Sequence, residues 1–348
     1  MCGSVENQLP TLIYSLSRCD GSRRWCGHIV AVLAVLLGCD AESIATIDRK
    51  SESIHVVATV GMVADIVSQV GGPRVVVKQL MGPGVDPHLY KGTRDDVRAI
   101  LAADIVIYSG LMLEGKLTDM LEKVSSRKPV VAITTALDHS TVLNEDGNHG
   151  HPDPHVWMDV AAWSKCVVVV ADTLSQHDPP NEPQYREAAE MYRQKLTQLH
   201  DYGKRVISSV PPAGRLLITS HDAFQYFGRA YGLEVFGVQG LSTDSEAGLR
   251  QINSLVDTIV DRKIAAVFVE SSVPRKSILA VVDGAESRGH RVIVGGELYS
   301  DAMGAGGTYE GTYIGMLDHN LTLVARSLGG QAPERGMQSL LAAEFRHP

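Results

Sequence analysis

Short runs of consecutive apolar residues recur along the chain, and each is followed by a stretch in which apolar residues repeat at helical spacing. The runs of the first half are 55–60, 75–80, 105–109 and 130–134, and those of the second half are 215–220, 234–238, 265–270 and 291–294. Strands of continuous Val, Ile and Leu are buried on both faces, as in parallel sheets that helices cover. The pattern therefore predicts an α/β fold in which each half forms a mostly parallel sheet.

A long polar segment, 181–210, separates the two halves and carries apolar residues at helical spacing. Pro183 lies near its start, where a helix tolerates proline, and Pro211 and Pro212 follow it and cannot continue a helix. At a rise of 1.5 Å per residue such a helix is about 40 Å long. We therefore predict two lobes joined by one long rigid helix, with a cleft between the lobes. One domain with a long peripheral helix is the alternative.

The N-terminal segment has the features of an export signal. Arg18, Arg23 and Arg24 precede the apolar run 29–37. This run is about ten residues long, whereas a stable membrane-spanning helix needs about 20. We therefore expect an exported protein, in the periplasm or on the outer face of the cytoplasmic membrane. The predicted parts are the signal (1–39), an N-terminal lobe (40–180), the connecting helix (181–211) and a C-terminal lobe (212–348).

The end of this segment predicts a lipid anchor. Residues 36–39 read Leu-Leu-Gly-Cys, which resembles a bacterial lipobox and would make Cys39 the acylated first residue of the mature protein. The alternative is that Cys39 is a small residue near an ordinary cleavage site. With Cys39 either acylated or removed with the signal, Cys166 would be the one remaining thiol of five cysteines, in an apolar run that predicts a buried, unreactive thiol.

The composition and charge of the chain limit the kinds of molecule that it is expected to bind. The chain has 348 residues, of which 44% are hydrophobic and 21% charged, and its formal net charge is -8. Lys and Arg do not cluster beyond the N-terminal segment, so we expect no nucleic-acid partner. We expect a monomer.

Four side chains of metal-binding type follow predicted strands or lie in turn-rich loops. His88 and His155 each end an Asp-Pro-His tripeptide, and His221 and Asp301 follow strands of the second half. Ligands of open α/β sheets bind beyond the carboxyl ends of the strands, so two candidates from each lobe would converge on the cleft. Three imidazoles and one carboxylate complete a ligand set for a borderline divalent ion without a thiolate.

With these residues the chain resembles the cluster A-I, TroA-like solute-binding proteins of ABC metal importers. The resemblance runs from about residue 55 to the C-terminus and includes the tracts 220–227, 237–249 (GVQGLSTDSEAGL) and 307–320. It implies two lobes, a long connecting helix, and delivery of one zinc or manganese ion to a permease and its ATPase. It also implies metal binding by the residues that correspond to His88, His155, His221 and Asp301.

The ligand types leave the choice of metal open. Three imidazoles favour zinc, whereas a bidentate Asp301 would raise the coordination number to five, which manganese also accepts. Manganese-selective members of the family resembled commonly carry Glu where this chain has His221. Because the imidazoles must be unprotonated to bind, we expect metal affinity to fall as the pH drops through the ordinary histidine range, near 6 to 7.

A further cluster of histidines precedes His155. His139, His149 and His151 lie in a segment rich in Asp, Asn, Gly and Pro. Zinc-selective relatives often carry a longer loop of this type, but three histidines form a poor metal-collecting arm. We interpret the segment as a solvated loop, with metal collection as the alternative.

Two other functions are compatible with the sequence. A zinc hydrolase also uses three histidines, but it needs a general base and an open coordination position, and no HExxH helix or nucleophile elbow is present. The chain is therefore expected not to be an enzyme. A surface adhesin of the same fold is the second alternative, and a lipid anchor at Cys39 suits it equally well.

Overall fold

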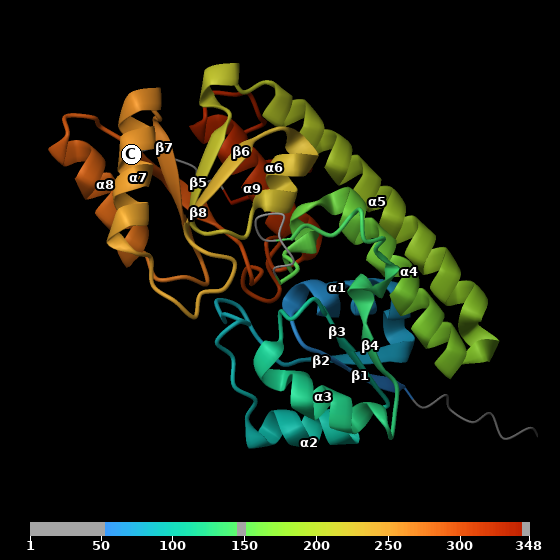
Figure 1. Ribbon diagram of the computed structural model, residues 1–348. Helices are drawn as coiled ribbons and strands as arrows, with labels where there is room; N and C mark the ends of the chain where they lie inside the picture. The colour runs from blue at the N-terminus through green and yellow to red at the C-terminus, as the bar shows by residue number, and fades with distance from the viewer. Residues whose placement is uncertain (1–52, 145–150, 343–348) are drawn as a thin grey trace, which may run out of the picture. The chain divides into compact units, whose positions relative to one another are not determined.

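A computed structural model describes residues 53–144 and 151–342. The first half forms a four-stranded parallel sheet of order β2-β1-β3-β4. Its elements are β1 (Ile54–Ala58), α1 (Gly61–Gly71), β2 (Val75–Gln79), α2 (Arg94–Ala102), β3 (Ile105–Tyr108), α3 (Thr118–Ser125), β4 (Val130–Ala132) and α4 (Val160–His177). Helix α1 lies on one face of this sheet, and α2 and α3 lie on the other (Figure 1).

The second half repeats the alternation of strand and helix. Its elements are β5 (Leu216–His221), α6 (Gln225–Tyr231), β6 (Glu234–Gln239), α7 (Leu249–Arg262), β7 (Ala266–Glu270), α8 (Lys276–Ser287), β8 (Ile293–Leu298) and α9 (Tyr313–Ser327). Backbone hydrogen bonds pair β5 with β6 and β7 with β8, in parallel, and β5 lies beside β7. The carboxyl ends of β5 and β7 therefore lie next to each other. The predicted fold class is confirmed.

The long helix α5 (Glu182–Ser208) joins the two halves, as the segment 181–210 predicts. It packs against α1 and α4 of the first half and against α6 and α9 of the second (Figure 1). Its buried positions recur at helical spacing, and each buried leucine contributes roughly 1.5–3 kcal/mol to folding.

Two tyrosines fix α5 by polar contacts in addition to this packing. The Tyr192 hydroxyl donates to the Asp65 carboxylate of α1 at 2.5 Å. Tyr202 pairs with the Thr322 hydroxyl of α9 at 2.7 Å. These hydrogen bonds therefore tie the helix to both halves.

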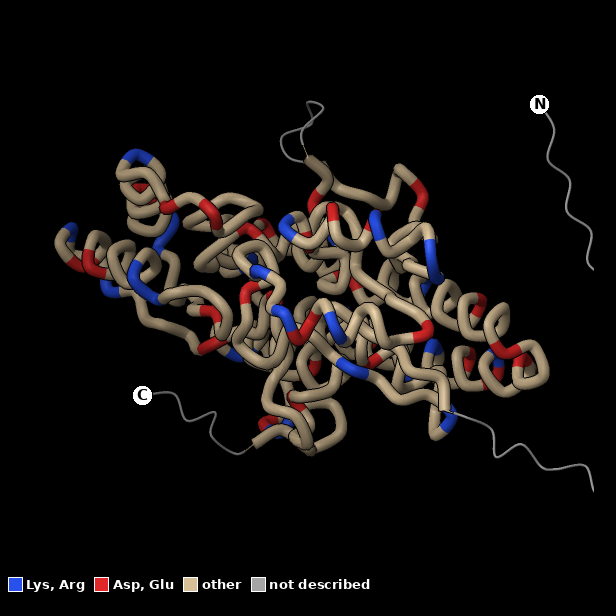
Figure 2. The backbone as a smooth tube through the Cα atoms, turned by 90° about the horizontal axis from the view of Figure 1, so that it is seen from below, with Lys and Arg blue, Asp and Glu red and all other residues tan. Residues whose placement is uncertain are grey.

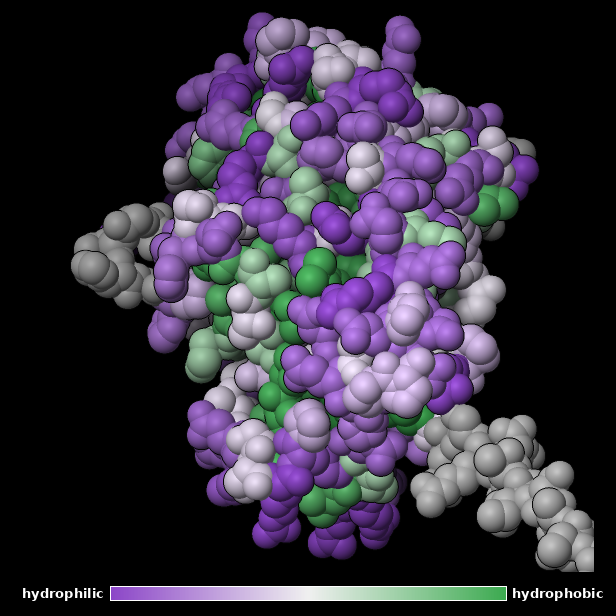
Figure 3. Space-filling model, turned by 90° about the vertical axis from the view of Figure 1, so that its right-hand side faces the viewer, coloured by the Kyte–Doolittle hydropathy of each residue, from purple (hydrophilic) through white to green (hydrophobic). Residues whose placement is uncertain are grey.

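The surface of the described residues is mostly hydrophilic on the face that Figure 3 presents, with hydrophobic residues gathered near its middle. Basic and acidic residues are interspersed along the backbone (Figure 2). Among the described residues, every helix is too short or too polar to cross a lipid bilayer. The export signal and Cys39 lie outside the described residues.

Candidate metal centre

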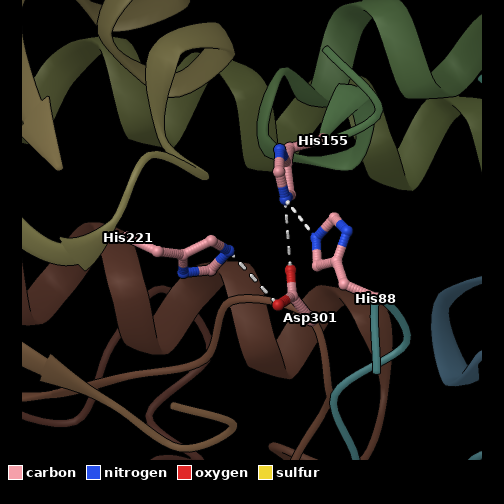
Figure 4. A group of neighbouring side chains, drawn as sticks. All are labelled: His88, His155, His221 and Asp301. Atoms are coloured by element: carbon pink, nitrogen blue, oxygen red, sulfur yellow. Dashed lines mark hydrogen bonds and ion pairs between the residues drawn. The ribbon is translucent and has the colours of Figure 1, made fainter. Parts of the chain in front are cut away.

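The structure brings His88, His155, His221 and Asp301 together (Figure 4). One ligand atom of each lies within 4.8 Å of those of the other three, and all four residues are buried. Each half of the chain supplies two of them, as the sequence predicts. Their role as metal ligands stays a prediction.

Both histidines of the first half are held by the carboxylate of their own Asp-Pro-His tripeptide. The backbone N–H of His88 donates to Asp86 Oδ1 at 2.8 Å, and that of His155 donates to Asp153 Oδ1 at 2.9 Å. An aspartate commonly forms this turn with the residue two positions on. Asp153 Oδ1 also lies 2.8 Å from the ring Nδ1 of His155, so the Nε2 atom is the one that points into the site.

The segment that follows His155 is also held in place by hydrogen bonds. A short 3-10 helix, Val156–Met158, follows directly, and Asp159 then caps α4 by accepting the backbone N–H groups of Ala161 and Ala162 at 3.0 and 3.2 Å. The indole N–H of Trp157 donates to the carbonyl of Ser300 at 2.8 Å. Trp157 thereby holds the segment of His155 against the residue that precedes Asp301.

His221 is the last residue of β5, and Glu270 is the last residue of the adjacent β7. The Glu270 carboxylate accepts the backbone N–H of His221 at 2.8 Å and contacts its ring Nδ1 at 2.5 Å. Carboxylates in this position fix the tautomer of a metal-binding histidine and increase its basicity. Sequence analysis did not single out Glu270, although a carboxylate at the end of a predicted buried strand was a usable signal.

The loop of Asp301 follows β8 and is anchored by α9. The side-chain amide of Asn320 accepts the backbone N–H of Tyr299 at 3.0 Å and donates to the carbonyl of the same residue at 2.7 Å. Asn320 is fully buried. This pair of hydrogen bonds fixes the position of the backbone at Tyr299, two residues before Asp301.

The distances between the four side chains suit one small ion. His155 Nε2 lies 3.3 Å from His88 Nε2 and 3.4 Å from Asp301 Oδ1, and His221 Nε2 lies 3.3 Å from Asp301 Oδ2. Four ligands at roughly 2.0–2.1 Å from a tetrahedral zinc ion are about 3.3–3.4 Å from each other. Both oxygens of Asp301 face imidazoles, so the group offers up to five ligand atoms.

Several of these buried atoms have no hydrogen bond within the described part of the chain. They include His221 Nε2 and both carboxylate oxygens of Asp301. An unsatisfied buried polar group is costly, and a bound cation would satisfy all three atoms at once. The donor set therefore fits a divalent transition metal.

Protonation of His88 and His155 differs because their surroundings differ. Burial lowers the pKa of His88 to about 4. Burial also opposes the charge of His155, but the hydrogen bond with Asp153 and the nearby Asp301 carboxylate outweigh it and raise its pKa to about 9. A metal must therefore displace a proton from His155 at neutral pH. The pH range over which metal affinity changes thus lies above the range of 6 to 7 expected from unperturbed histidines.

His221 and Asp301 each shift the pKa of the other. Burial disfavours charge on His221, but the nearby Glu270 and Asp301 carboxylates raise its pKa well above the ordinary value. Burial would raise the pKa of Asp301, but His221 and His155 hold it well below the usual range. Asp301 is therefore an anion that can neutralise part of the charge of a cation.

The other candidates lie outside this group. His151 lines the same hollow as His88, His139 lines a neighbouring hollow, and His149 lies outside the described residues. Whether this loop collects metal or is merely solvated stays open. Cys166 is buried, and burial raises the pKa of its thiol to about 12, as expected for an unreactive cysteine.

Comparison with known proteins agrees with this geometry. The family model described as "Zinc-uptake complex component A periplasmic" matches residues 56–327. The manganese-binding lipoprotein MntA of Bacillus subtilis is 43% identical over 305 residues, which cover 87% of this chain and 99% of that protein. The zinc-binding protein TroA of Treponema pallidum is 44% identical over 273 residues, or 78% of this chain and 88% of that one.

A solved structure shares the fold as well as the sequence. That of the periplasmic zinc-binding protein TroA from Treponema pallidum matches with a TM-score of 0.77 at 43% identity, over 79% of this chain and 99% of that one. The resemblance inferred from the sequence is therefore confirmed. The chain belongs to the family of the periplasmic zinc-uptake complex component A.

Proposed function

We propose that this protein captures a zinc or manganese ion outside the cytoplasm with His88, His155, His221 and Asp301, and delivers it to an ABC importer. The observation that carries this proposal is the convergence of four buried ligand side chains from distant segments on one point. Capture is binding without chemistry: the ion sheds water, Asp301 neutralises part of its charge, and the imidazoles supply nitrogen ligands. A permease and its ATPase would receive the ion.

The relatives support both metals. One is named for manganese and another for zinc, at nearly equal identity to this chain. The spacing of the ligand atoms suits zinc, and the two oxygens of Asp301 leave room for the higher coordination number of manganese. We therefore propose that the site accepts either ion.

We further propose that Cys39 carries a lipid that holds the protein, as a monomer, at the outer face of the cytoplasmic membrane. The relative MntA is named a lipoprotein. The two lobes would then be 40–180 and 212–348, with 181–211 as the connecting helix. Incorporation of a labelled fatty acid that is lost in Cys39→Ser tests the anchor, and sedimentation of the protein without its signal tests the monomer.

A metal-dependent hydrolase is the weaker interpretation of the same residues. Catalysis needs a coordination position open to water, whereas a bidentate Asp301 and three imidazoles fill the ligand set. The relatives are named as binding proteins. An adhesive role independent of metal has no particular observation in its favour.

Metal analysis and thermal unfolding test the proposal together. Protein purified from its native host without added metal should contain about one zinc or manganese ion per chain. Binding to the folded state at 100 times Kd should stabilise it by roughly 2.7 kcal/mol and raise the thermal midpoint. His155→Ala and His221→Ala should abolish that rise.

A matched control separates specific binding from surface binding. His177 is exposed at the end of α4 and is not one of the four candidates that converge. His177→Ala should keep the metal-induced rise in the thermal midpoint. If neither zinc nor manganese shifts the midpoint of the unsubstituted protein, the proposed function is wrong.

A further inference from the structure

A hollow of about 650 Å³ leads to the candidate metal centre, and it lies between loops of the two halves. The first half contributes 111–113 with Lys116, and the second contributes 239–242 and 244–248, from the loop 239–248 between β6 and α7. Of the four candidate ligands, His88 lines this hollow. His88 is also 9% exposed, whereas His155 and His221 are fully buried. A metal that leaves by this route would therefore pass His88.

Two adjacent residues of the loop 239–248 contact the first half. The Thr243 hydroxyl donates to Asp86 Oδ2 at 2.5 Å. The next residue, Asp244, forms an ion pair with Lys116 at 2.9 Å. The loop of the second half is thus tied to the first half at two points.

The two ties differ in strength. Side chains of Lys116 and Asp244 are 35% and 54% exposed, and such surface ion pairs contribute little and weaken with salt. Thr243 and Asp86 are both partly buried, and a short hydrogen bond to a carboxylate is among the stronger kinds. The contact between Thr243 and Asp86 is therefore the main tie.

Asp86 connects this tie to a candidate ligand. Its Oδ2 accepts the Thr243 hydroxyl, while its Oδ1 accepts the backbone N–H of His88. In the equivalent tripeptide, Asp153 directs its carboxylate to the ring of His155, so that histidine is fixed through its own side chain. His88 is instead held through its backbone, by a carboxylate whose second oxygen is bound by the opposite half.

We propose that Thr243 is a positioning residue that slows metal release: through Asp86 it holds His88 in the ligand group. The ion pair of Lys116 with Asp244 keeps the loop where Thr243 reaches Asp86. When the Thr243 hydrogen bond opens, Asp86 loses one of its two anchors and His88 gains freedom to leave the ion. This inference rests on the proposed function, because it concerns the rate at which the same site loses its metal.

Zinc release from three variants tests the role of Thr243. Each protein is loaded with one equivalent of zinc and mixed with excess chromogenic chelator, and the rate of zinc transfer is recorded. Thr243→Val keeps the shape but removes the donor, and loss of a hydrogen bond to a charged group should speed release about tenfold. Thr243→Ser keeps a hydroxyl and should release zinc at the rate of the unsubstituted protein. Lys116→Met should have a smaller effect, which high salt removes.

Two controls distinguish positioning from a general loss of structure. Thr258→Val removes a hydroxyl that donates to the carbonyl of Ser254 within α7, and should leave the release rate unchanged. In an Asp86→Ala background, Thr243→Val should no longer speed release, because the residue through which it acts is gone. Metal-free Thr243→Val should still unfold in one cooperative transition, as metal-free Thr243→Ser does, which shows that the fold persists without this hydrogen bond.

The outcomes separate this inference from the proposed function. If the unsubstituted protein binds zinc but Thr243→Val releases it no faster, the inference is wrong and the proposed function stands. An equal acceleration in the presence and absence of Asp86 would also overturn it, because Thr243 would then act by another route. If the unsubstituted protein binds neither zinc nor manganese, the proposed function itself fails.

Discussion

Glu270 holds His221 at two points, the backbone N–H at 2.8 Å and the ring Nδ1 at 2.5 Å. The two residues end adjacent strands, β5 and β7, so their approach follows from the sheet itself. Asp153 holds His155 in the same two ways. Each of these imidazoles therefore has its Nδ1 occupied and its Nε2 directed at the site before any ion arrives.

Glu270→Gln should weaken zinc binding about tenfold, the low end of the range for such partners of metal-bound histidines, because an amide oxygen can still accept from Nδ1. What the variant loses is the negative charge that makes the imidazole a better ligand. Calorimetric titration with zinc measures the change. Asp222→Asn is the matched control, since the partly buried Asp222 carboxylate accepts from Gln225 rather than from a candidate ligand. An equal loss of zinc affinity in Glu270→Gln and Asp222→Asn would indicate a general effect of removing negative charge.

His221→Glu should weaken the binding of both zinc and manganese, because it places a second carboxylate against Glu270. The double variant His221→Glu/Glu270→Gln relieves this repulsion and offers an oxygen ligand with a neutral partner. Oxygen ligands suit manganese better than nitrogen ligands do, so the double variant should recover manganese binding and lose preference for zinc. Competition titrations of the two ions measure the preference. Recovery of zinc rather than manganese would contradict the argument.

Zinc affinity should rise with pH across the neutral range. The pKa of His155 is raised to about 9 and that of His221 is raised well above its ordinary value, so at neutral pH a metal must displace both protons, whereas His88, with a pKa of about 4, is already neutral. Calorimetry in buffers of different ionisation enthalpy should show proton release on zinc binding at pH 7. Binding that is independent of pH between 6 and 9 would count against this protonation state.

The raised pKa of His155 also leads to a prediction for the metal-free protein. A folded pKa of about 9 against an unfolded value near 6.5 means that His155 stabilises the fold below about pH 6.5. That contribution is lost as the pH rises through 9. The gain in thermal midpoint on adding zinc should therefore be larger at pH 8 than at pH 6.

Gly203→Ala should destabilise the protein even though alanine favours a helix. A Cβ at position 203 of α5 would lie 2.6 Å from the ring of Tyr231 and 2.9 Å from the side chain of Leu321. Overpacking of this kind costs about 1–3 kcal/mol, against a gain in helix propensity of about 1 kcal/mol. Urea unfolding measures the net loss. Lys204→Ala, at the exposed neighbouring position, should change the free energy of unfolding little.

The sequence predicted the fold well where a residue's own neighbours determine structure. The eight apolar runs all became strands, because continuous Val and Ile in short segments suit buried parallel strands. Their ends were less accurate: the run 130–134 ends as a strand at Ala132, where Ile133–Ala136 turns into a 3-10 helix. The long helix begins and ends within two residues of the predicted segment.

The site could be predicted only as far as ligand types and strand ends allow. The two Asp-Pro-His tripeptides look alike in sequence, and in both the aspartate accepts the histidine's backbone N–H. They differ because Asp86 meets Thr243, 157 residues along the chain, whereas Asp153 meets its own histidine ring. That difference depends on which distant loop packs above each tripeptide, and local sequence contains no signal of it.

The two tyrosine hydrogen bonds of α5 have a consequence for how an importer would sense cargo. Swinging one half away from the other would shear Tyr192 from Asp65 or Tyr202 from Thr322, together with the apolar contacts around them. The loaded and empty forms should therefore differ by little more than the position of surface loops. An importer that distinguishes the two forms must therefore recognise a local change in the shape of the surface. A crystal structure of the empty form should superimpose on that of the loaded form almost everywhere else.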